Sequence, residues 1–222
     1  MARIARVVVP NVPYHILNRG NHRQEVFILE SDKLLYLKLL GENGKEFEIS
    51  FLAYCLMDNH LHLVAIPKTK DSFAKGFGET NRKYSSIINI RESWTGQMWQ
   101  GRFKSFPMDE SYLFEAVRYT ERNPVRAGLV KKASDFLWSS AAAHITGAGN
   151  PLLALCDPSK YISVDDWVSY LDEDNNEDSV AKIRKHTRSG RPLGSESFVV
   201  QMEALTGRKL TAAAPGRRRR VK

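Results

Sequence analysis

The chain has 222 residues, of which 42% are hydrophobic, and it contains ten Phe, eight Tyr and four Trp. This composition excludes a disordered chain and suits one sizeable globular domain with an extension. No run of about 18 apolar residues occurs, and the first residues lack the apolar core of a signal peptide, so we expect a cytoplasmic protein without membrane contact. Cys55 and Cys156 lie far apart and form no metal-type pair, which fits buried thiols in a reducing compartment.

The net charge of +8 is distributed unevenly along the chain. Residues 1–135 carry 20 basic against 15 acidic side chains, residues 136–178 carry one against eight, and residues 179–222 carry twelve against two. We therefore expect one domain over 1–135, an irregular acidic connector over 136–178, and a basic tail over 179–222 with short helices and a disordered end. The positive balance indicates a polyanionic partner, although a basic tail alone is equally typical of a solubilising end.

Hydrophobic periodicity, turn residues and capping residues predict the elements of the first 135 residues. In chain order they are a strand within 6–17, delayed by two prolines; a basic turn over 18–23; a helix capped at 31–32 and ending at 41–44; strands over 49–56 and 60–66, paired as a hairpin; a helix from 71–72 to about 90; a strand over 98–108; and a helix capped at 109–111 and ending at 123–124.

This order, strand-helix-strand-strand-helix-strand, is the ferredoxin-like split pattern of the α+β class. It predicts a four-stranded antiparallel sheet with two helices on one face, which leaves the other face free for a site or a partner. The helix over residues 109–123 follows this unit. Beyond it we expect a short helix near 165–171, two further short helices over 179–186 and 195–205, and disorder over 215–222.

The pair His60 and His62 is the sharpest chemical feature. Residues i and i+2 of a strand point to the same face, so both imidazoles project together while Leu61 and Leu63 enter the opposite face. Two neutral imidazoles at this spacing can share one divalent cation. An isolated His-x-His pair, however, is more often two ordinary polar residues on an exposed face.

Tyr119 and Asn123 form a second feature, on the helix that ends the first 135 residues. They are four residues apart, so a phenol and an amide lie on one face about 5.4 Å apart along the axis. Beside two metal-bound imidazoles they would suit a nucleophile and a third ligand. A tyrosine in this position can also be a packing residue with its hydroxyl in water.

Two segments carry a resemblance to a known family. Residues 57–64 (MDNHLHLV) and 118–130 (RYTERNPVRAGLV) resemble the signature segments of the REP-associated tyrosine transposases, which belong to the HUH endonucleases. Residues 9–15, 18–21, 99–105 and 187–194 are similar to further family segments in the same order. The resemblance covers residues 7–130 and 187–207, whereas residues 136–178 match nothing in the family.

The resemblance implies a metal-dependent endonuclease and strand transferase that acts on single-stranded DNA. His60 and His62 would bind Mg²⁺ or Mn²⁺ with Asn123 as third ligand, where insertion-sequence relatives often have Gln. Tyr119 would attack the scissile phosphate and form a 5′-phosphotyrosine link. The implied substrate is a palindromic hairpin of the REP type, and a monomer is expected rather than a helix-swapped dimer.

Recognition of a hairpin needs phosphate contacts for position and base contacts for specificity. The candidates are basic, polar and aromatic residues that flank the predicted strands, together with one residue of the tail. Aromatic side chains would stack unpaired bases, although aromatic core residues are commoner, and the run from Arg217 to Arg220 would add electrostatic attraction. The predicted DNA-binding residues are Arg19, Asn21, Arg23, Trp99, Arg102, Phe103, Lys104 and Arg191.

Two other classes of function remain open on the sequence. A non-catalytic nucleic-acid-binding module explains the charge and the sheet, but it leaves the histidine pair without a role. A metal-dependent phosphodiesterase or ribonuclease would use the histidine pair with an activated water and would not need Tyr119. The tyrosine nickase explains His60, His62, Tyr119 and Asn123 together.

Overall fold

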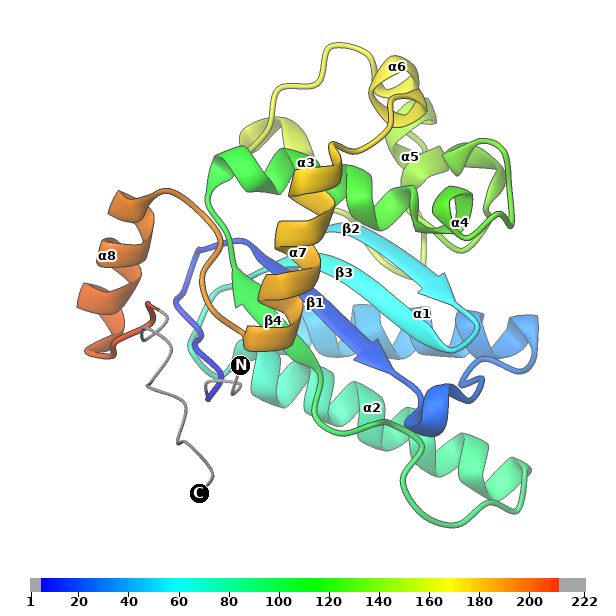
Figure 1. The fold of residues 1–222 in the computed structure, drawn as a ribbon. Coiled ribbons are helices and arrows are strands. Elements are labelled where there is room, and N and C mark those ends of the chain that lie inside the picture. Colours follow the sequence, from blue (N-terminus) through cyan, green and yellow to red (C-terminus); the bar gives the residue numbers. More distant parts are fainter. Residues whose placement is uncertain (1–4, 212–222) are drawn as a thin grey trace, which may run out of the picture.

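The structure is a computed structural model that describes residues 5–211. Its strands are β1 (Tyr14–Arg19), β2 (Ile49–Met57), β3 (His60–Pro67) and β4 (Lys104–Pro107). They form an antiparallel sheet in the order β2-β3-β1-β4 (Figure 1). The predicted α+β class and the four-stranded antiparallel sheet are confirmed.

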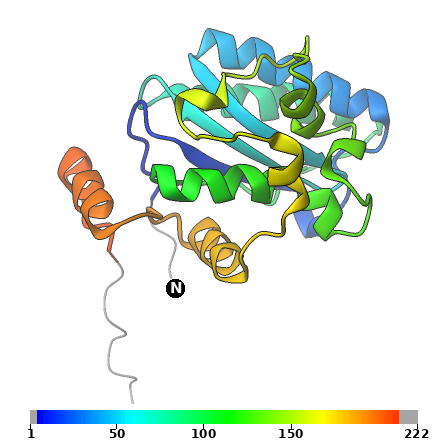
Figure 2. The same cartoon turned by 90° about the horizontal axis from the view of Figure 1, so that it is seen from above.

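Two long helices, α1 (Glu30–Glu46) and α2 (Ser72–Arg91), cover one face of the sheet (Figure 2). Alternate side chains of β3 point toward them, so Leu61 and Leu63 join the core that these helices share with the sheet. The helix predicted to begin at Asp71-Ser72 does so, with Asp71 in the N-cap position.

The opposite face also carries helices. The apolar residues Val64 and Phe106 of the sheet pack against Leu113 and Val117 of α3 (Glu110–Glu121), and α7 (Glu177–Ser189) lies beside α3 on the same side (Figure 2). The expectation that this face would be free is therefore wrong. Val64 and its neighbours are apolar on a strand that is apolar on both faces, and such a strand requires two covering layers.

The predicted connector follows the outer edge of β2. The backbone N–H of Leu56 donates to Trp138 O at 2.8 Å, and that of Ser140 donates to Tyr54 O at 3.0 Å. Within residues 5–211, four helices besides α7 lie beyond α3: α4 (Asn123–Arg126), α5 (Ala141–Thr146), α6 (Trp167–Asp172) and α8 (Glu196–Thr206). Short 3-10 turns lie among them at Ala133–Asp135 and Pro158–Lys160, and another, Asn21–Arg23, follows β1.

Helices α6, α7 and α8 were expected, whereas α5 was not. The predicted disorder of residues 215–222 and the basic run Arg217 to Arg220 lie outside the described residues. No helix within residues 5–211 has the length and apolar character required to cross a bilayer.

The first and fourth strands differ from their predicted bounds. β1 begins only at Tyr14, because Pro10 and Pro13 lack the N–H that a ladder needs, and Asn11 between them has a φ of 59°. Asn18 and Arg19, predicted in a turn, end this strand instead. β4 is limited to residues 104–107, because the preceding segment folds back over Gly20 through one bridge at Trp99.

Two helix ends also differ. α1 begins at Glu30, one residue before the expected cap, and the Asp32 carboxylate accepts from the backbone N–H groups of Ile28 and Leu29. α3 ends at Glu121, so Pro124 does not terminate it. The proline lies in the first turn of α4, where backbone N–H groups form no hydrogen bond within the helix and a residue without one is tolerated.

Asp109 fixes the start of α3. Its Oδ1 accepts from Tyr112 N at 3.2 Å, and its Oδ2 accepts from Ser195 N at 2.8 Å, so it joins α3 to the segment before α8. We expect Asp109→Ala to lower the free energy of unfolding by about 1–2 kcal/mol in urea titrations. The control is Asp166→Ala, since Asp166 caps only the six-residue α6. An equal or larger loss in the control would contradict this role of Asp109.

Candidate active site

The histidine pair lies at the start of β3, on the face of the sheet that α3 covers. The ring centroids of His60 and His62 are 5.1 Å apart, and His62 is 4% exposed whereas His60 is half-buried. The β1–β3 register sets Arg19 opposite His60 and Leu17 opposite His62. Both imidazoles therefore share one face, at the boundary between the apolar layer under α3 and solvent.

Hydrogen bonds fix the orientation of each imidazole. His60 Nδ1 donates to Asn59 Oδ1 at 2.5 Å, which leaves a lone pair on His60 Nε2. His62 Nδ1 lies 2.9 Å from Nε2 of His15, a fully buried residue of β1. When His62 is the donor of this bond, its Nε2 also carries a lone pair. This arrangement resembles the outer-shell partners that orient histidine ligands in metal sites.

Burial keeps these rings neutral. It lowers the pKa of His60 to about 4, with a further contribution from the positive charges of Arg19 and Arg126. Burial also lowers the pKa of His15 to about 3 and holds the pKa of His62 well below its ordinary value. At neutral pH the imidazoles are therefore unprotonated bases, the form that binds a metal ion.

Helix α3 brings Tyr119 against the histidines. The Tyr119 ring centroid lies 5.5 Å from that of His62 and 5.8 Å from that of His15, and the residue is 6% exposed. The packing of Leu113 and Val117 on the sheet holds the helix in this position. A phenol and two imidazoles from separate elements thus meet in one chain.

Asn123 reaches the same place from α4. Its Nδ2 donates to His60 Nε2 at 3.3 Å, and its Oδ1 accepts from an Arg126 N–H at 3.0 Å. The amide therefore faces His60 with its donor. To present oxygen to a cation at His60 it must turn, and Nδ2 would then oppose the guanidinium. Asn123 lies within reach of the pair, and its role as third ligand stays a prediction.

His15 and Arg126 are residues of this cluster that the sequence reasoning missed. The Arg126 guanidinium lies 4.0 Å from the centroid of the Tyr119 ring and donates to the Tyr119 carbonyl oxygen at 3.3 Å. Its place three residues after Asn123 offered a signal, because such residues share a helix face. His15 offered none, since only the pairing of β1 with β3 brings it to His62.

Part of the predicted DNA-binding set gathers near the histidines. Arg19, Arg102 and Lys104 line a recess of about 100 Å³ between the ends of β1 and β4, together with Asn18 and the loop at Gln100. Arg102 is exposed, and Arg19 and Lys104 are half-buried. Asn21 and Arg23 lie in the 3-10 turn that follows β1. These positions place basic and polar groups along one margin of the histidine face.

The three remaining candidates are engaged inside the protein. Trp99 and Phe103 are 8% and 4% exposed and belong to the core beneath α1 and α2, and the Arg6 guanidinium lies 3.6 Å from the centroid of the Phe103 ring. Their predicted stacking on unpaired bases has no free ring face here. Arg191 donates to the backbone oxygens of Leu210 and Thr211, so it fastens the end of the tail.

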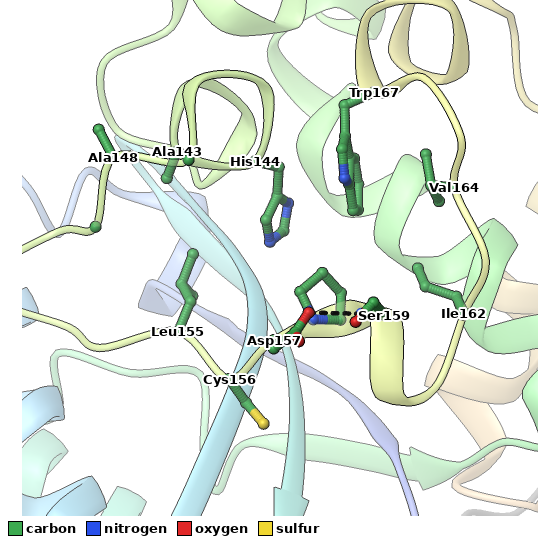
Figure 3. Close-up of a pocket in the computed structure, with 13 residues that line it drawn as sticks. Ala143, His144, Ala148, Leu155, Cys156, Asp157, Ser159, Ile162, Val164 and Trp167 are labelled. Carbon is green, nitrogen blue, oxygen red and sulfur yellow. Dashed lines mark hydrogen bonds between the residues drawn. The ribbon is translucent and has the colours of Figure 1, made fainter.

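A separate cavity of about 300 Å³ lies in the connector (Figure 3), and neither His60 nor His62 lines it. His144 and Trp167 stack with centroids 4.3 Å apart at its wall, and Cys156 lines it as a free thiol. Within residues 5–211, no three His, Cys, Asp or Glu side chains are grouped to hold a metal ion. Any metal site at His60 and His62 must therefore draw further ligands from amides, water or substrate.

Comparison with known proteins identifies the family. The sequence profile described as "Transposase IS200 like" matches residues 8–123, which is about half of the chain and includes β1 to β4, His60, His62 and Tyr119. The chain therefore belongs to the IS200-like transposase family. No curated protein matches it.

One solved structure supports the fold. The chain is similar to a REP-associated tyrosine transposase bound to a REP hairpin, with a TM-score of 0.55, 18% identity, and coverage of 74% of this chain and 96% of that one. A putative transposase from Deinococcus radiodurans gives a TM-score of 0.36 and 20% identity, with coverage of 47% of this chain and 84% of that one. The first likeness shows that the chain has the fold of a tyrosine transposase.

The contact between His15 and His62 gives a prediction for metal binding. His15→Phe keeps a ring in the buried space but removes the hydrogen-bond partner of His62. We expect the dissociation constant for Mn²⁺, measured by calorimetry, to rise about 10–100-fold. The control is His186→Phe, because His186 contacts Phe106 and the backbone of Arg191 instead. Equal affinities in the two variants would contradict the positioning role of His15.

Proposed function

We propose that this transposase is a metal-dependent endonuclease and strand transferase that cuts single-stranded DNA through a covalent 5′-phosphotyrosine intermediate. The observation that supports the proposal most strongly is the position of Tyr119, whose ring lies 5.5 Å from that of His62 and is fixed by α3. Neither a binding module nor a water-dependent hydrolase needs a tyrosine held against the histidine pair.

The residues present fit a divalent cation. His60 Nε2 has a lone pair fixed by the Asn59 hydrogen bond, and the lowered pKa values of both histidines favour the neutral form. We propose His60 and His62 as ligands of Mg²⁺ or Mn²⁺, with Asn123 as the third after its amide turns. When bound, the cation supplies positive charge that polarises the scissile phosphate.

The chain's own groups account for the bond changes. The Tyr119 Oη attacks phosphorus and forms a phosphotyrosine ester, while the bond to the 3′ oxygen breaks and that oxygen leaves as a 3′-hydroxyl after taking a proton. Because one phosphodiester replaces another, the reverse attack by a 3′-hydroxyl can rejoin strands without ATP. The hydrophobic layer under α3 keeps the Tyr119 ring in one place and so favours in-line attack.

We propose a palindromic hairpin of the REP type, in cytoplasmic DNA, as the substrate. The REP-associated tyrosine transposase that shares this fold was solved with such a hairpin. In this chain Arg19, Arg102 and Lys104 surround one recess beside the histidines. The exposed Arg102 and the half-buried Arg19 and Lys104 suit phosphate contacts at the foot of a hairpin, whereas Asn21 can read a base edge.

The test is formation of a covalent protein–DNA adduct. We expect the purified protein to give a slower band on denaturing protein gels after incubation with labelled single-stranded hairpin DNA and Mn²⁺ or Mg²⁺. Tyr119→Phe should abolish the band, because it removes the attacking oxygen and keeps the ring. Tyr112→Phe is the matched control, since Tyr112 is on the same helix and its hydroxyl accepts from Lys182 instead of facing the histidines.

Other outcomes identify the alternatives. Cleavage without an adduct that persists in Tyr119→Phe means a water nucleophile, and the protein is then a phosphodiesterase or ribonuclease. Hairpin binding without cleavage in any metal means a non-catalytic binding module. Each result contradicts the proposed nickase.

We further propose that the active unit is a monomer. Tyr119 reaches His60 and His62 within one chain, so exchange of helices is not required to complete the site. A mixture of His60→Ala and Tyr119→Phe chains should therefore give no adduct, whereas a helix-swapped dimer would rebuild one intact site. Wild-type protein diluted to the same site concentration shows that the gel can detect such an adduct. Adduct formation in the mixture would overturn the monomer.

A further inference from the structure

A basic groove opens beside the nucleophile, between α4 and the first half of α7. It has a volume of about 540 Å³. Its basic lining residues are Arg122, Arg126 and Arg184, and Asp174 and Glu177 are its acidic ones. Because Arg126 also lies over the Tyr119 ring and donates to Asn123, which contacts His60, the groove leads to the tyrosine beside the histidine pair.

Arg126 is held in place without a counterion. Two of its N–H groups donate to Asn123 Oδ1 and to the Tyr119 carbonyl, and its planar face lies 4.0 Å from the centroid of the tyrosine ring. A guanidinium has five N–H groups, so three remain for another acceptor. The residue as a whole is exposed, and it lines the groove.

The arginines of the groove differ in their partners. Arg122 donates to Asp174 and to the Leu171 carbonyl, so its charge is compensated within the protein. In the described part of the chain, no carboxylate forms an ion pair with Arg126 or Arg184. Glu177 also lines the groove, but it is not among the ion-pair partners in residues 5–211. The positive charges of Arg126 and Arg184 are therefore uncompensated there.

We propose that this groove binds the phosphodiester backbone of single-stranded DNA next to the cut, with Arg126 on the scissile phosphate and Arg184 on a neighbouring phosphate. The inference rests on the proposed function and extends it to residues of α4 and α7. Guanidinium groups bind phosphate through parallel N–H donors, and Arg126 is pre-oriented by two hydrogen bonds and one ring. A phosphate attacked by Tyr119 Oη must lie at the rim of the ring that Arg126 covers.

This arrangement also gives Arg126 a chemical effect. Negative charge that builds on the phosphate oxygens during attack is stabilised by a cation fixed in advance. Arg184 lines the groove from α7, and we expect it to contribute affinity through charge alone. Substitutions of the two arginines should therefore have different effects. Loss of Arg126 should slow adduct formation, and loss of Arg184 should weaken DNA binding.

The first experiment measures binding without cleavage. Hairpin DNA with a single-stranded flank is titrated in EDTA at several salt concentrations. Arg184→Ala should weaken binding about 5–10-fold and reduce the slope of log K against log salt by about 0.7, the value for one phosphate contact on single strands. Lys75 is an exposed residue of α2, on the other face of the sheet. Lys75→Ala removes the same charge and should change neither the affinity nor the salt slope.

A second experiment locates the contacted phosphate. Neutral methylphosphonates are placed one at a time along the flank, and each DNA is titrated with wild type and with Arg184→Ala. At the contacted position the neutral group should weaken DNA binding by wild type. It should leave the affinity of Arg184→Ala unchanged, because that variant has already lost the interaction. Additive losses at every position, or wild-type affinity and salt slope in Arg184→Ala, would overturn the groove.

A third variant tests Arg126 by rate. Arg126→Gln should slow adduct formation about 10²–10³-fold while binding in EDTA weakens less than 10-fold. Arg126→Lys keeps the charge and should recover part of the rate, whereas a merely structural Arg126 would change both measurements together. If wild type forms no adduct but the Arg184 binding results hold, the proposed nickase fails and the groove stands as a DNA-binding site.

Discussion

The packing of α3 on the second face of the sheet is the contact on which the site depends. Strand β3 has apolar side chains on both faces at Leu63, Val64 and Ala65, so each face needs a cover. The apolar stripe of α3 supplies the second cover over Val64 and leaves the His60 end of the strand to the last turn of the helix. Tyr119 lies in that last turn. One hydrophobic interface thus fixes the separation of the tyrosine from the histidines.

The cluster beneath this interface carries buried polar groups that the fold satisfies only in part. His15 and His62 share one hydrogen bond at 2.9 Å, yet His15 Nδ1 has no partner. A buried nitrogen of this kind costs about 1–3 kcal/mol relative to a paired one. Apolar residues in place of His15 and His62 would avoid that cost. The histidines are therefore better explained by the chemistry of the site than by stability.

Sequence patterns were sufficient where one element decides the outcome. Alternation along β3 set His60 and His62 on one face, and the Asp71 and Asp109 caps located two helix starts. The same patterns failed where the structure depends on contacts between segments that are distant in the sequence. The second cover of the sheet comes partly from α7, and the edge of β2 is bounded by connector residues, which no local period reveals.

The same limit applies to individual residues of the site. Arg191 and Phe103 have residue types that suit DNA, but their partners are Leu210 and Arg6, which lie far along the chain. A basic or aromatic side chain does not indicate in sequence whether its charge or ring face is already used. Arg102, of the same residue type, remains exposed.

The acidic connector explains how this transposase distributes its charge. Glu173 pairs with Arg118 at 3.0 Å, and Asp174 pairs with Arg122, both on the side of α3 that faces the connector. Exposed carboxylates of this kind add little stability, so their main effect is on the electrostatic field. They neutralise the arginines that precede Asn123 and stop short of Arg126. Positive charge without an ion-pair partner in residues 5–211 is thereby left at Arg126, next to the Tyr119 ring.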